Sequence, residues 1–306
     1  MLQNNISVVI PAKNEAAVVE DVVRGVLAVL PDAQVIVVDD GSTDATKEKA
    51  ESAGALVFSH LYSKGNGAAI KTGARRATGD IIVFMDADSQ HRASDIPRLL
   101  ERFNEGYDMV VGARSTGSQA SYGRLAANTL YNRMASWMVG HRVDDLTSGF
   151  RVVRASYFRQ FLHLLPNGFS YPTTITMSFF RSGYSVSYVP IEAAKRVGKS
   201  HISLSKDGIR FLLIIFKIGT LYSPLKLFSP ISAFFFLTGS FYYLYTYMSA
   251  GRFTNMSALL FSTSVIIFLM GLISEQITSL AYSGRGPARS TDEISNGKNR
   301  SDGDKI

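Results

Sequence analysis

Short apolar runs alternate with amphipathic stretches along the first part of the chain, a pattern that predicts strands separated by helices. The expected strands are Ile6–Ile10, Gln34–Asp39, Ala55–Ser59, Asp80–Met85 and Asp108–Gly112, and the expected helices are 15–29, 43–53, 66–77 and 94–105. Such alternation predicts βαβ units and a mostly parallel sheet in an α/β fold. The runs are rich in Val and Ile, as in strands that helices cover on both faces.

Two long uncharged stretches near the C-terminus predict membrane spans. They run from Leu227 to Gly251 and from Phe253 to Ser274. As a helix, the first would be about 37 Å long, enough for a hydrocarbon core of about 30 Å. We expect two transmembrane helices within 226–282 rather than buried core helices, because the stretches are long and adjacent.

Basic residues are distributed unevenly around these spans. The turn between them carries Arg252, whereas the outer ends carry Lys217, Lys226, Arg285 and Arg289. The positive-inside rule therefore predicts a multi-pass protein of the cytoplasmic membrane, with both termini and the N-terminal domain in the cytoplasm.

The segment before the spans combines apolar and basic residues. Ser203–Leu221 is typical of an amphipathic helix on the membrane surface, although a helix packed against the domain gives the same pattern. The expected organisation is a catalytic domain at 1–200, an interface region at 201–225, the spans at 226–282, and a disordered polar tail at 283–306.

Net charge and cysteine content limit the binding partners and the kinds of chemistry expected of this chain. The net charge is +7, and between Lys195 and Lys226 basic residues outnumber the single acid Asp207. Because this cluster leads into the apolar spans, we expect anionic membrane lipids rather than nucleic acid as the partner. The chain has no Cys, which excludes disulfides, thiolate catalysis and Cys-ligated zinc.

The sequence Asp86-Ala87-Asp88-Ser89-Gln90 directly follows an apolar strand. Two carboxylates and an amide oxygen suit Mg²⁺ or Mn²⁺, which are usually shared with substrate phosphates. In an open α/β sheet, ligands bind beyond the carboxyl ends of strands, where this turn is expected. The turn therefore predicts a metal-assisted site for a nucleotide diphosphate.

Three further loops are candidates for donor binding. Residues 11–15 (PAKNE) follow the first strand and 39–44 (DDGSTD) the second, so both are expected at the rim that carries the metal turn. Residues 64–67 (KGNG) precede a helix and offer backbone N–H groups and a cation to a phosphate.

The ordered motifs resemble the family 2 glycosyltransferases of GT-A fold, and among them the polyprenyl-phosphate sugar transferases typified by dolichol-phosphate mannose synthase. The resemblance runs from about Ile6 to Ser283. It depends on the motifs above together with GAR at 112–114, SGFR at 148–151, the basic segment near 199 and the paired spans.

The resemblance implies roles for individual residues. The nucleoside would be held by Pro11, Glu15 and Asp39, with Lys64 close to it, and the donor site would also include Asp86 and Ala87. The metal would be held by Asp86, Asp88 and Gln90. The acceptor phosphate would be bound by Arg114, Arg124, Asn128, Arg196 and Lys199. The expected catalytic residues are Asp88, Arg114, Arg124 and Arg196.

The implied reaction is inverting transfer of one sugar from a UDP- or GDP-linked donor to a polyprenyl phosphate such as undecaprenyl phosphate, as in building cell-envelope glycans. A phosphate monoester is already anionic near neutral pH, since its second pKa is about 6, so no strong general base is required. Three alternatives remain open: transfer to a glycolipid hydroxyl with Asp144 or Asp145 as base, polysaccharide synthesis, and an inactive membrane scaffold. A loop-ordering role is favoured for both Asp residues, and the oligomeric state is open.

Overall fold

A computed structural model describes residues 5–114, 122–168, 171–192, 216 and 219–282, with the side chains of 122–128 and 281–282 excepted. The strands are β1 (Ile6–Ala12), β2 (Gln34–Asp39), β3 (Leu56–Ser59), β4 (Ile81–Phe84), β5 (Met109–Arg114), β6 (Arg151–Arg154) and β7 (Val186–Ile191). The helices are α1 (Val19–Val29), α2 (Thr46–Ser52), α3 (Asn66–Arg76), η1 (Ala93–Asp95), α4 (Ile96–Asn104), α5 (Tyr122–Val139), α6 (Ala155–Gln160), α7 (Tyr171–Arg181), α9 (Pro224–Ala250) and α10 (Asn255–Tyr282).

The strands form one seven-stranded sheet in the order β3-β2-β1-β4-β6-β5-β7. β1, β2, β3 and β4 pair in parallel, as do β5 and β7. β6 is inserted between β4 and β5 and runs antiparallel to both. The expectation of a mostly parallel α/β sheet is thus confirmed.

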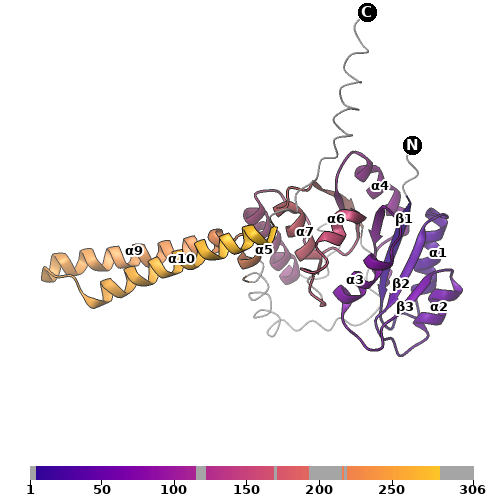
Figure 1. The fold of residues 1–306 in the computed structure, drawn as a ribbon, viewed down its shortest axis with the longest axis horizontal. Helices are drawn as coiled ribbons and strands as arrows, with labels where there is room; N and C mark the ends of the chain where they lie inside the picture. Colours follow the sequence, from indigo (N-terminus) through magenta and orange to yellow (C-terminus); the bar gives the residue numbers. More distant parts are fainter. Residues whose placement is uncertain (1–4, 115–121, 169–170, 193–215, 217–218, 283–306) are drawn as a thin grey trace, which may run out of the picture.

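Helices cover both faces of the sheet (Figure 1). On one face, α1, α2 and α4 bury side chains such as Val22, Ala50 and Leu99 against outward residues of β1 and β2. On the other, α3, α5, α6 and α7 contribute a second apolar layer that includes Ile70 and Phe158. Because both faces are covered, the central strands are apolar on both sides, as their Val- and Ile-rich sequences indicate.

The last two helices form a hairpin that projects from the domain (Figure 1). Pro224–Ala250 and Asn255–Leu280 are long and apolar enough to cross a membrane. In the most apolar 18-residue stretch of each helix, only 11% and 17% of the residues are buried. Core helices of a soluble protein are mostly buried, so the alternative of two core helices is wrong.

The expected elements match the observed ones closely in the first half of the chain. β2 has the expected bounds, whereas α1 begins at Val19 rather than at 15. β6, β7 and α5–α7 were not anticipated. Most of the expected interface segment 203–221, and the whole tail 283–306, lie outside the described residues.

Candidate active site

The ends of five strands bring the candidate residues to one edge of the sheet. β1 ends beside Asp39, the last residue of β2. Asp86 follows β4, and Arg114 ends β5. Arg151 begins β6 at the same edge, because β6 runs antiparallel to its neighbours. This edge, here called the rim, collects the predicted donor, metal and acceptor motifs.

The first two loops of the rim are tied together by hydrogen bonds. The Asn14 N–H donates to Ser42 Oγ at 2.9 Å, and the Thr43 N–H donates to Asn14 Oδ1 at 2.8 Å. The Glu15 N–H donates to Thr46 Oγ1 at 2.9 Å. The Val19 N–H donates to Glu15 O at 3.0 Å, so Glu15 lies in the turn that leads into α1. Pro11, Glu15 and Asp39 are thereby carried on one interlocked unit.

Asp40 organises the third loop. Its buried carboxylate lies 2.7 Å from His60 Nδ1 and accepts hydrogen bonds at 2.8 Å from Ser63 Oγ and from the N–H groups of Lys64 and Gly65. Burial alone would raise the pKa of Asp40, but these hydrogen bonds hold it below its usual range. Sequence reasoning missed this residue, although it stands next to Asp39 in the same motif.

The role expected for the backbone at 64–67 is therefore wrong. The N–H groups of Lys64 and Gly65 are bound by Asp40, and the Gly67 N–H donates to Gly168 O at 3.3 Å. A phosphate would find these donors already used. What the loop brings to the rim is the Lys64 side chain, whose Nζ lies 5.6 Å from the centroid of the Tyr62 ring.

The metal turn is folded so that its oxygen-bearing residues stay close. Asp88 Oδ1 accepts from the Gln90 N–H at 3.2 Å, and Ser89 between them adopts a left-handed backbone with φ of 59°. Ala87 is buried in the apolar core, so only its backbone can face a nucleotide. The turn thus carries Asp86, Asp88 and Gln90 within five residues at the end of β4, and their role as metal ligands stays a prediction.

The space around Asp86 depends on a glycine. A Cβ placed on Gly149 would lie 2.5 Å from Asp86 Oδ2, so a larger residue would displace the carboxylate. On its other side, His91 Nδ1 lies 3.7 Å from the same oxygen, and the His91 ring stacks on Phe150. Gly149 belongs to the SGFR motif, but the motif did not predict its contact with Asp86, because that contact joins the loop before β6 to the turn after β4.

The donor set fits a divalent cation that shares its ligands with a substrate. Within the part of the chain that the structure describes, no three His, Cys, Asp or Glu side chains form a metal cluster. Two carboxylates and one amide oxygen are an incomplete set for Mg²⁺ or Mn²⁺. Such ions usually take their remaining ligands from phosphates and water.

Arg114 lies beside this turn in a two-pronged ion pair. Its Nε donates to Asp145 Oδ2 at 2.8 Å and its Nη2 to Asp145 Oδ1 at 3.0 Å, while Nη2 also donates to Thr147 Oγ1. Burial alone would lower the pKa of Arg114, but Asp145, and more weakly Asp86 and Asp88, raise it. The guanidinium is therefore a fixed cation next to the metal turn, and its Nη1 stands outside these contacts.

Asp145 orders the loop that leads into β6. It also accepts from the backbone N–H groups of Thr147 and Ser148 at 3.0 and 3.1 Å. Burial alone would raise its pKa, but Arg114 and these hydrogen bonds hold the pKa below its usual range. A carboxylate of this kind is a poor base, so the loop-ordering role expected for Asp145 is confirmed.

Arg151 of the SGFR motif is a structural residue. Its side chain is fully buried, and it donates to Ser148 O, Pro172 O and Thr176 Oγ1. It thereby joins the loop before β6 to the first turns of α7. Tyr171, at the start of α7, is equally buried, and that burial, with Asp86 nearby, raises the pKa of its hydroxyl.

Four predicted acceptor residues lie wholly or partly outside the residues that the structure describes. Arg196 and Lys199 fall outside the described residues. Arg124 and Asn128 belong to α5, but their side chains are also outside the described set. The rim therefore shows the donor loops, the metal turn and Arg114 together.

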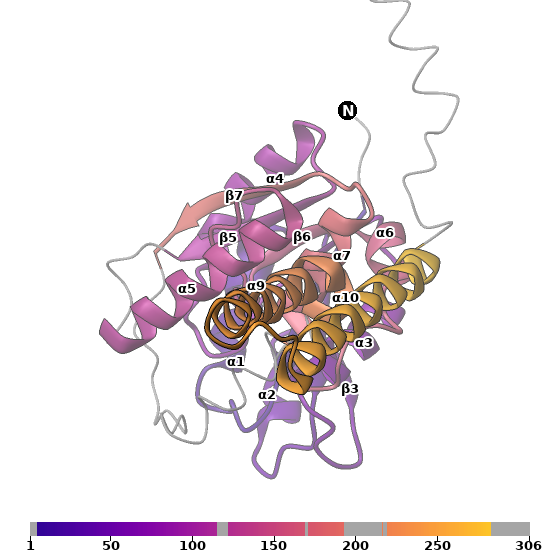
Figure 2. The same cartoon turned by 90° about the vertical axis from the view of Figure 1, so that its left-hand side faces the viewer.

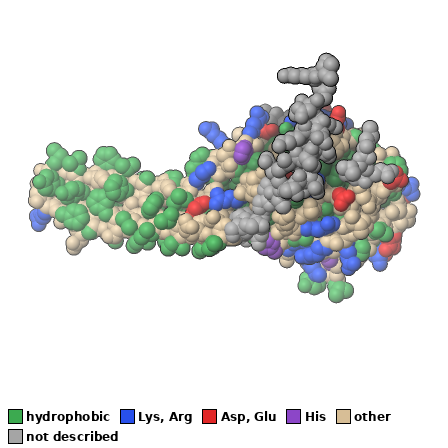
Figure 3. Space-filling model, turned by 45° about the horizontal axis from the view of Figure 1, so that its top comes forward, with side chains coloured by type: hydrophobic (Ala, Val, Ile, Leu, Met, Phe, Trp, Pro, Cys, Tyr) green, Lys and Arg blue, Asp and Glu red, His purple; other side chains and the backbone are tan. Residues whose placement is uncertain are grey.

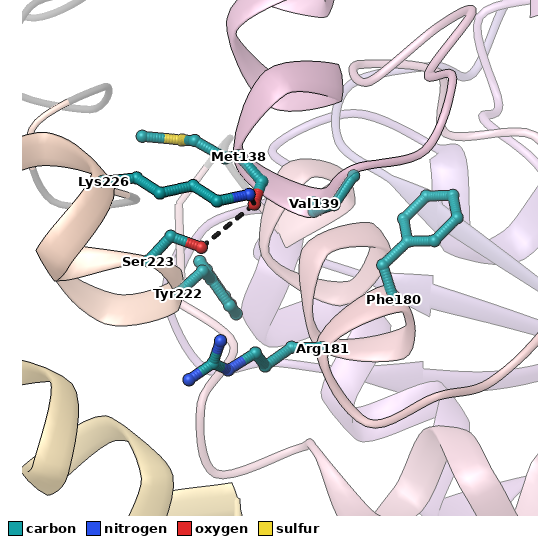
Figure 4. A pocket seen from close by; sticks show the side chains of 7 residues that line it. All are labelled: Met138, Val139, Phe180, Arg181, Tyr222, Ser223 and Lys226. Carbon is teal, nitrogen blue, oxygen red and sulfur yellow. Dashed lines mark hydrogen bonds between the residues drawn. The ribbon is translucent and has the colours of Figure 1, made fainter.

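A cavity of about 220 Å³ lies elsewhere, where the hairpin joins the domain (Figure 4). It is lined by residues of α5, α7 and the start of α9, including Met138, Arg181 and Lys226. No rim residue lines it, so it is not the donor site.

Two family models match the chain. Residues 7–162 match "Glycosyl transferase family 2", and residues 223–280 match "GtrB C-terminal hairpin". The first match covers the whole rim up to α6, and the second covers α9 and almost all of α10. With the two apolar helices, the hairpin match indicates a membrane-associated protein.

Known relatives include polyprenyl-phosphate sugar transferases. The chain is 29% identical over 211 residues to dolichyl-phosphate hexose transferase of Haloferax volcanii, covering 67% of this chain and 90% of that protein. It is 33% identical over 170 residues to undecaprenyl-phosphate 4-deoxy-4-formamido-L-arabinose transferase of Enterobacter sp., covering 52% of each. The match spans about half the length of the second relative.

Among solved structures, the fold is similar to glucosyl-3-phosphoglycerate synthase from Mycobacterium tuberculosis. The match to its complex with Mn²⁺, uridine-diphosphate-glucose and phosphoglyceric acid has a TM-score of 0.56 and 25% identity, and it covers 70% of this chain and 80% of that chain. From the matched family model, the arrangement of the rim and these relatives, the chain belongs to glycosyl transferase family 2 and is a glycosyltransferase.

Proposed function

We propose that this protein transfers one sugar from a nucleotide-diphosphate sugar to a polyprenyl phosphate at the cytoplasmic face of a membrane, with inversion at the anomeric carbon. The proposal rests mainly on the placement of the metal turn beside a fixed arginine on the rim, in a chain that also carries an apolar helical hairpin. The relatives named for dolichyl and undecaprenyl phosphate support the acceptor class.

The donor would bind across the interlocked loops. Pro11, Glu15 and Asp39 would face the nucleoside, with Lys64 close to it. Asp86, Asp88 and Gln90 would hold Mg²⁺ or Mn²⁺, which supplies charge neutralisation for the departing diphosphate. The Mn²⁺ and uridine-diphosphate-glucose in the similar synthase support a divalent metal and favour a UDP-sugar over a GDP-sugar.

The acceptor would attack without a protein base. A phosphate oxygen of the lipid forms a bond to the anomeric carbon, while the bond from that carbon to the nucleoside diphosphate breaks. Arg114 would place one cation near the incoming phosphate, and Arg124, Asn128, Arg196 and Lys199 would complete the anion site. The low pKa of Asp145 and its commitment to Arg114 support a base-free reaction.

The hairpin would hold the rim near the membrane surface. The far turn of the hairpin carries one basic residue, Arg252, whereas its outer ends are flanked by Lys217, Lys226, Arg285 and Arg289, an asymmetry that favours cytoplasmic termini. In this orientation the glycosylated lipid would be released into the cytoplasmic leaflet, from which the polyprenyl phosphate was taken.

The experiment is mass spectrometry of lipid products from the purified full chain in nanodiscs. The mixture would contain undecaprenyl phosphate, Mn²⁺ and a panel of UDP- and GDP-sugars. The proposal expects one glycosyl-phosphoryl-polyprenol, which EDTA abolishes. If product formed only on an added glycolipid with a free hydroxyl, the acceptor would be that hydroxyl and not a polyprenyl phosphate.

A further inference from the structure

His60 is a buried histidine to which the proposed reaction gives no role. It stands directly after β3, and its side chain is only 7% exposed. Its Nδ1 lies 2.7 Å from Asp40 Oδ1, and its Nε2 lies 2.9 Å from Thr72 Oγ1 of α3. The imidazole ring is therefore held on two sides, by the donor loop 39–44 and by a helix.

The partners of His60 determine which ring nitrogen carries the proton. Asp40 Oδ1 accepts from the Lys64 N–H and Asp40 Oδ2 from the Gly65 N–H, each at 2.8 Å, so both oxygens act as acceptors. The Nδ1 of His60 must then be the donor to Oδ1. In the neutral imidazole, Nε2 accepts a hydrogen bond from the Thr72 hydroxyl. The ring thus joins an acid to an alcohol in one defined orientation.

Thr72 is a fixed point, because α3 packs closely on the sheet. A Cβ on the neighbouring Gly73 would lie 2.2 Å from Val9 Cγ1, so the backbone of α3 lies directly on β1 there. Figure 2 shows α3 and β3 together in the lower part of the view, whereas β7 lies in the upper part. The hydrogen bond to Thr72 therefore ties His60 to the body of the domain.

The loop after His60 exposes its apolar side chains. Leu61 is 99% exposed and Tyr62 is 67% exposed, so burial of these side chains does not hold the loop in place. Hydrogen bonds to Asp40 fix the loop instead. Because His60 donates to the same carboxylate, it orients the group on which the loop depends.

Lys64 is the rim residue whose position depends on this arrangement. Its N–H donates to Asp40, while its side chain is exposed and its Nζ lies 5.6 Å from the centroid of the Tyr62 ring. The backbone of Lys64 is therefore ordered, and its ammonium group extends from an ordered loop. A cation held on ordered backbone loses less conformational entropy when it binds an anion.

We propose that His60 is a positioning residue for the nucleotide donor, and that it acts through Asp40 on the loop that carries Lys64. This rests on the proposed function, in which Lys64 lies close to the nucleoside. Loss of the bond from His60 loosens the carboxylate that holds the Lys64 N–H. The donor then binds more weakly, because the loop must be ordered at the moment of binding.

Two substitutions separate the two hydrogen bonds of His60. In His60→Asn, the amide nitrogen stands at about the place of Nδ1 and can still donate to Asp40. In His60→Gln, the longer side chain reaches the place of Nε2, so the contact with Thr72 is kept and the bond to Asp40 is lost.

Calorimetric titration with UDP or GDP, in the presence of Mn²⁺, measures the dissociation constant of the full chain in nanodiscs without turnover. We expect ~10-fold weaker binding for His60→Gln, because a hydrogen bond to a charged group is lost. For His60→Asn we expect a value within about threefold of the wild type, because that bond is kept.

A third variant tests whether the effect passes through Lys64. If it does, adding His60→Gln to Lys64→Met should weaken nucleotide binding by less than about twofold. His163→Gln makes the same chemical change at an exposed position and should leave binding unchanged. The midpoint of thermal unfolding, measured for each variant, separates weaker binding from loss of the fold.

The outcomes separate this inference from the proposed function. Wild-type affinity in His60→Gln would overturn it, and so would equal losses in His60→Asn and His60→Gln, which indicate only a packing role for the ring. A further loss of ~10-fold in the Lys64→Met background would also overturn it, because the two residues would then act independently. If neither UDP nor GDP bound to the wild type, the donor site of the proposed function would itself be refuted.

Discussion

At the scale of single residues, we expect turnover to depend most on the charge of the metal turn. Asp88→Asn keeps the shape of the side chain and removes its charge. We expect turnover to fall by ~100-fold or more, as when one electrostatic partner of a leaving group is removed. Initial rates over a Mn²⁺ titration measure the effect, and near-normal rates would contradict the metal assignment.

A matched control is available close by. Asp95→Asn makes the same chemical change in a residue that pairs with the half-exposed Arg98 at 2.9 Å. Such pairs contribute ~0–1 kcal/mol to folding. We therefore expect rates close to those of the wild type, which would exclude a general effect of losing one acid in this segment.

The glycine beside Asp86 gives a steric test of the same turn. In Gly149→Ala the new Cβ would need the space of Asp86 Oδ2, so the carboxylate must move. We expect the Mn²⁺ concentration for half-maximal rate to rise ~10-fold, in the range seen when residues that orient metal ligands are changed.

The control for this change is Gly25→Ala in α1. Its new Cβ would meet Ala93 Cβ at an ordinary 3.6 Å, and Ala is favoured over Gly inside a helix by ~1 kcal/mol. Normal Mn²⁺ dependence is expected there. An unchanged Mn²⁺ dependence in Gly149→Ala as well would show that Asp86 does not hold the metal in this position.

Asp145 gives a prediction for pH. Because its folded pKa is depressed, its stabilising contribution is present above the unfolded value of about 3.9 and is lost as pH falls through the folded value. Asp145→Asn should lower the free energy of unfolding by ~1–3 kcal/mol at pH 7, with the difference from the wild type shrinking below about pH 4.

Unfolding by urea across this pH range measures the difference. Asp144→Asn is the neighbouring control, since its partner Arg142 is 88% exposed and the pair is largely solvated. We expect a smaller effect there. A difference for Asp145→Asn that stays constant with pH would refute the view that its charge orders the loop.

At the scale of elements, α7 connects the rim to the hairpin. Its first turns are bound by Arg151, and its last residue, Arg181, pairs with Glu275 of α10 at 2.6 Å. Glu275 also accepts from the Leu225 N–H at the start of α9. One helix therefore extends from the rim to the apolar hairpin, and its ends are fixed by polar contacts.

A double-mutant cycle tests this connection. Arg181→Glu and Glu275→Arg should each lower the stability of the reconstituted protein by ~1 kcal/mol, because the side chains are only about a quarter exposed. The combined exchange should recover most of the loss. Strictly additive losses would show that the ion pair does not couple the hairpin to the domain.

Local sequence patterns predicted most of the N-terminal half. The strands of the βαβ units alternate with amphipathic helices, and Asp39 and Asp86 fall at strand ends, so both fold and rim could be predicted there. β6 could not, because a four-residue strand inserted antiparallel between β4 and β5 is stabilised by pairing distant in sequence. The same applies to Gly149 and Arg151, whose contacts arise only from that pairing.

One prediction failed because neighbours competed for the same donors. The glycine-rich turn at 64–67 has the composition of a phosphate loop, but Asp40 takes two of its N–H groups. A motif gives the residue types and not their partners. Asp40 stands next to Asp39 in the same motif, but the sequence does not show that its side chain is buried and binds this loop.

At the scale of the whole molecule, an open rim and an apolar hairpin occur in one chain. The surface of the hairpin is predominantly apolar, whereas charged side chains of both signs cover the domain (Figure 3). This division suits an enzyme that takes one substrate from water and the other from a bilayer. The central claim is that the second substrate reacts through a phosphate oxygen.

The most direct measurement compares two acceptors that differ only in that group. Undecaprenyl phosphate and undecaprenol would be given separately to the full chain in nanodiscs, with the donor sugar nucleotide identified in the UDP- and GDP-sugar panel. Mass spectrometry would identify the lipid products. We expect a glycosyl phosphodiester from undecaprenyl phosphate and no glycoside from undecaprenol. Equal transfer to undecaprenol would contradict it, because the enzyme would then be activating a hydroxyl.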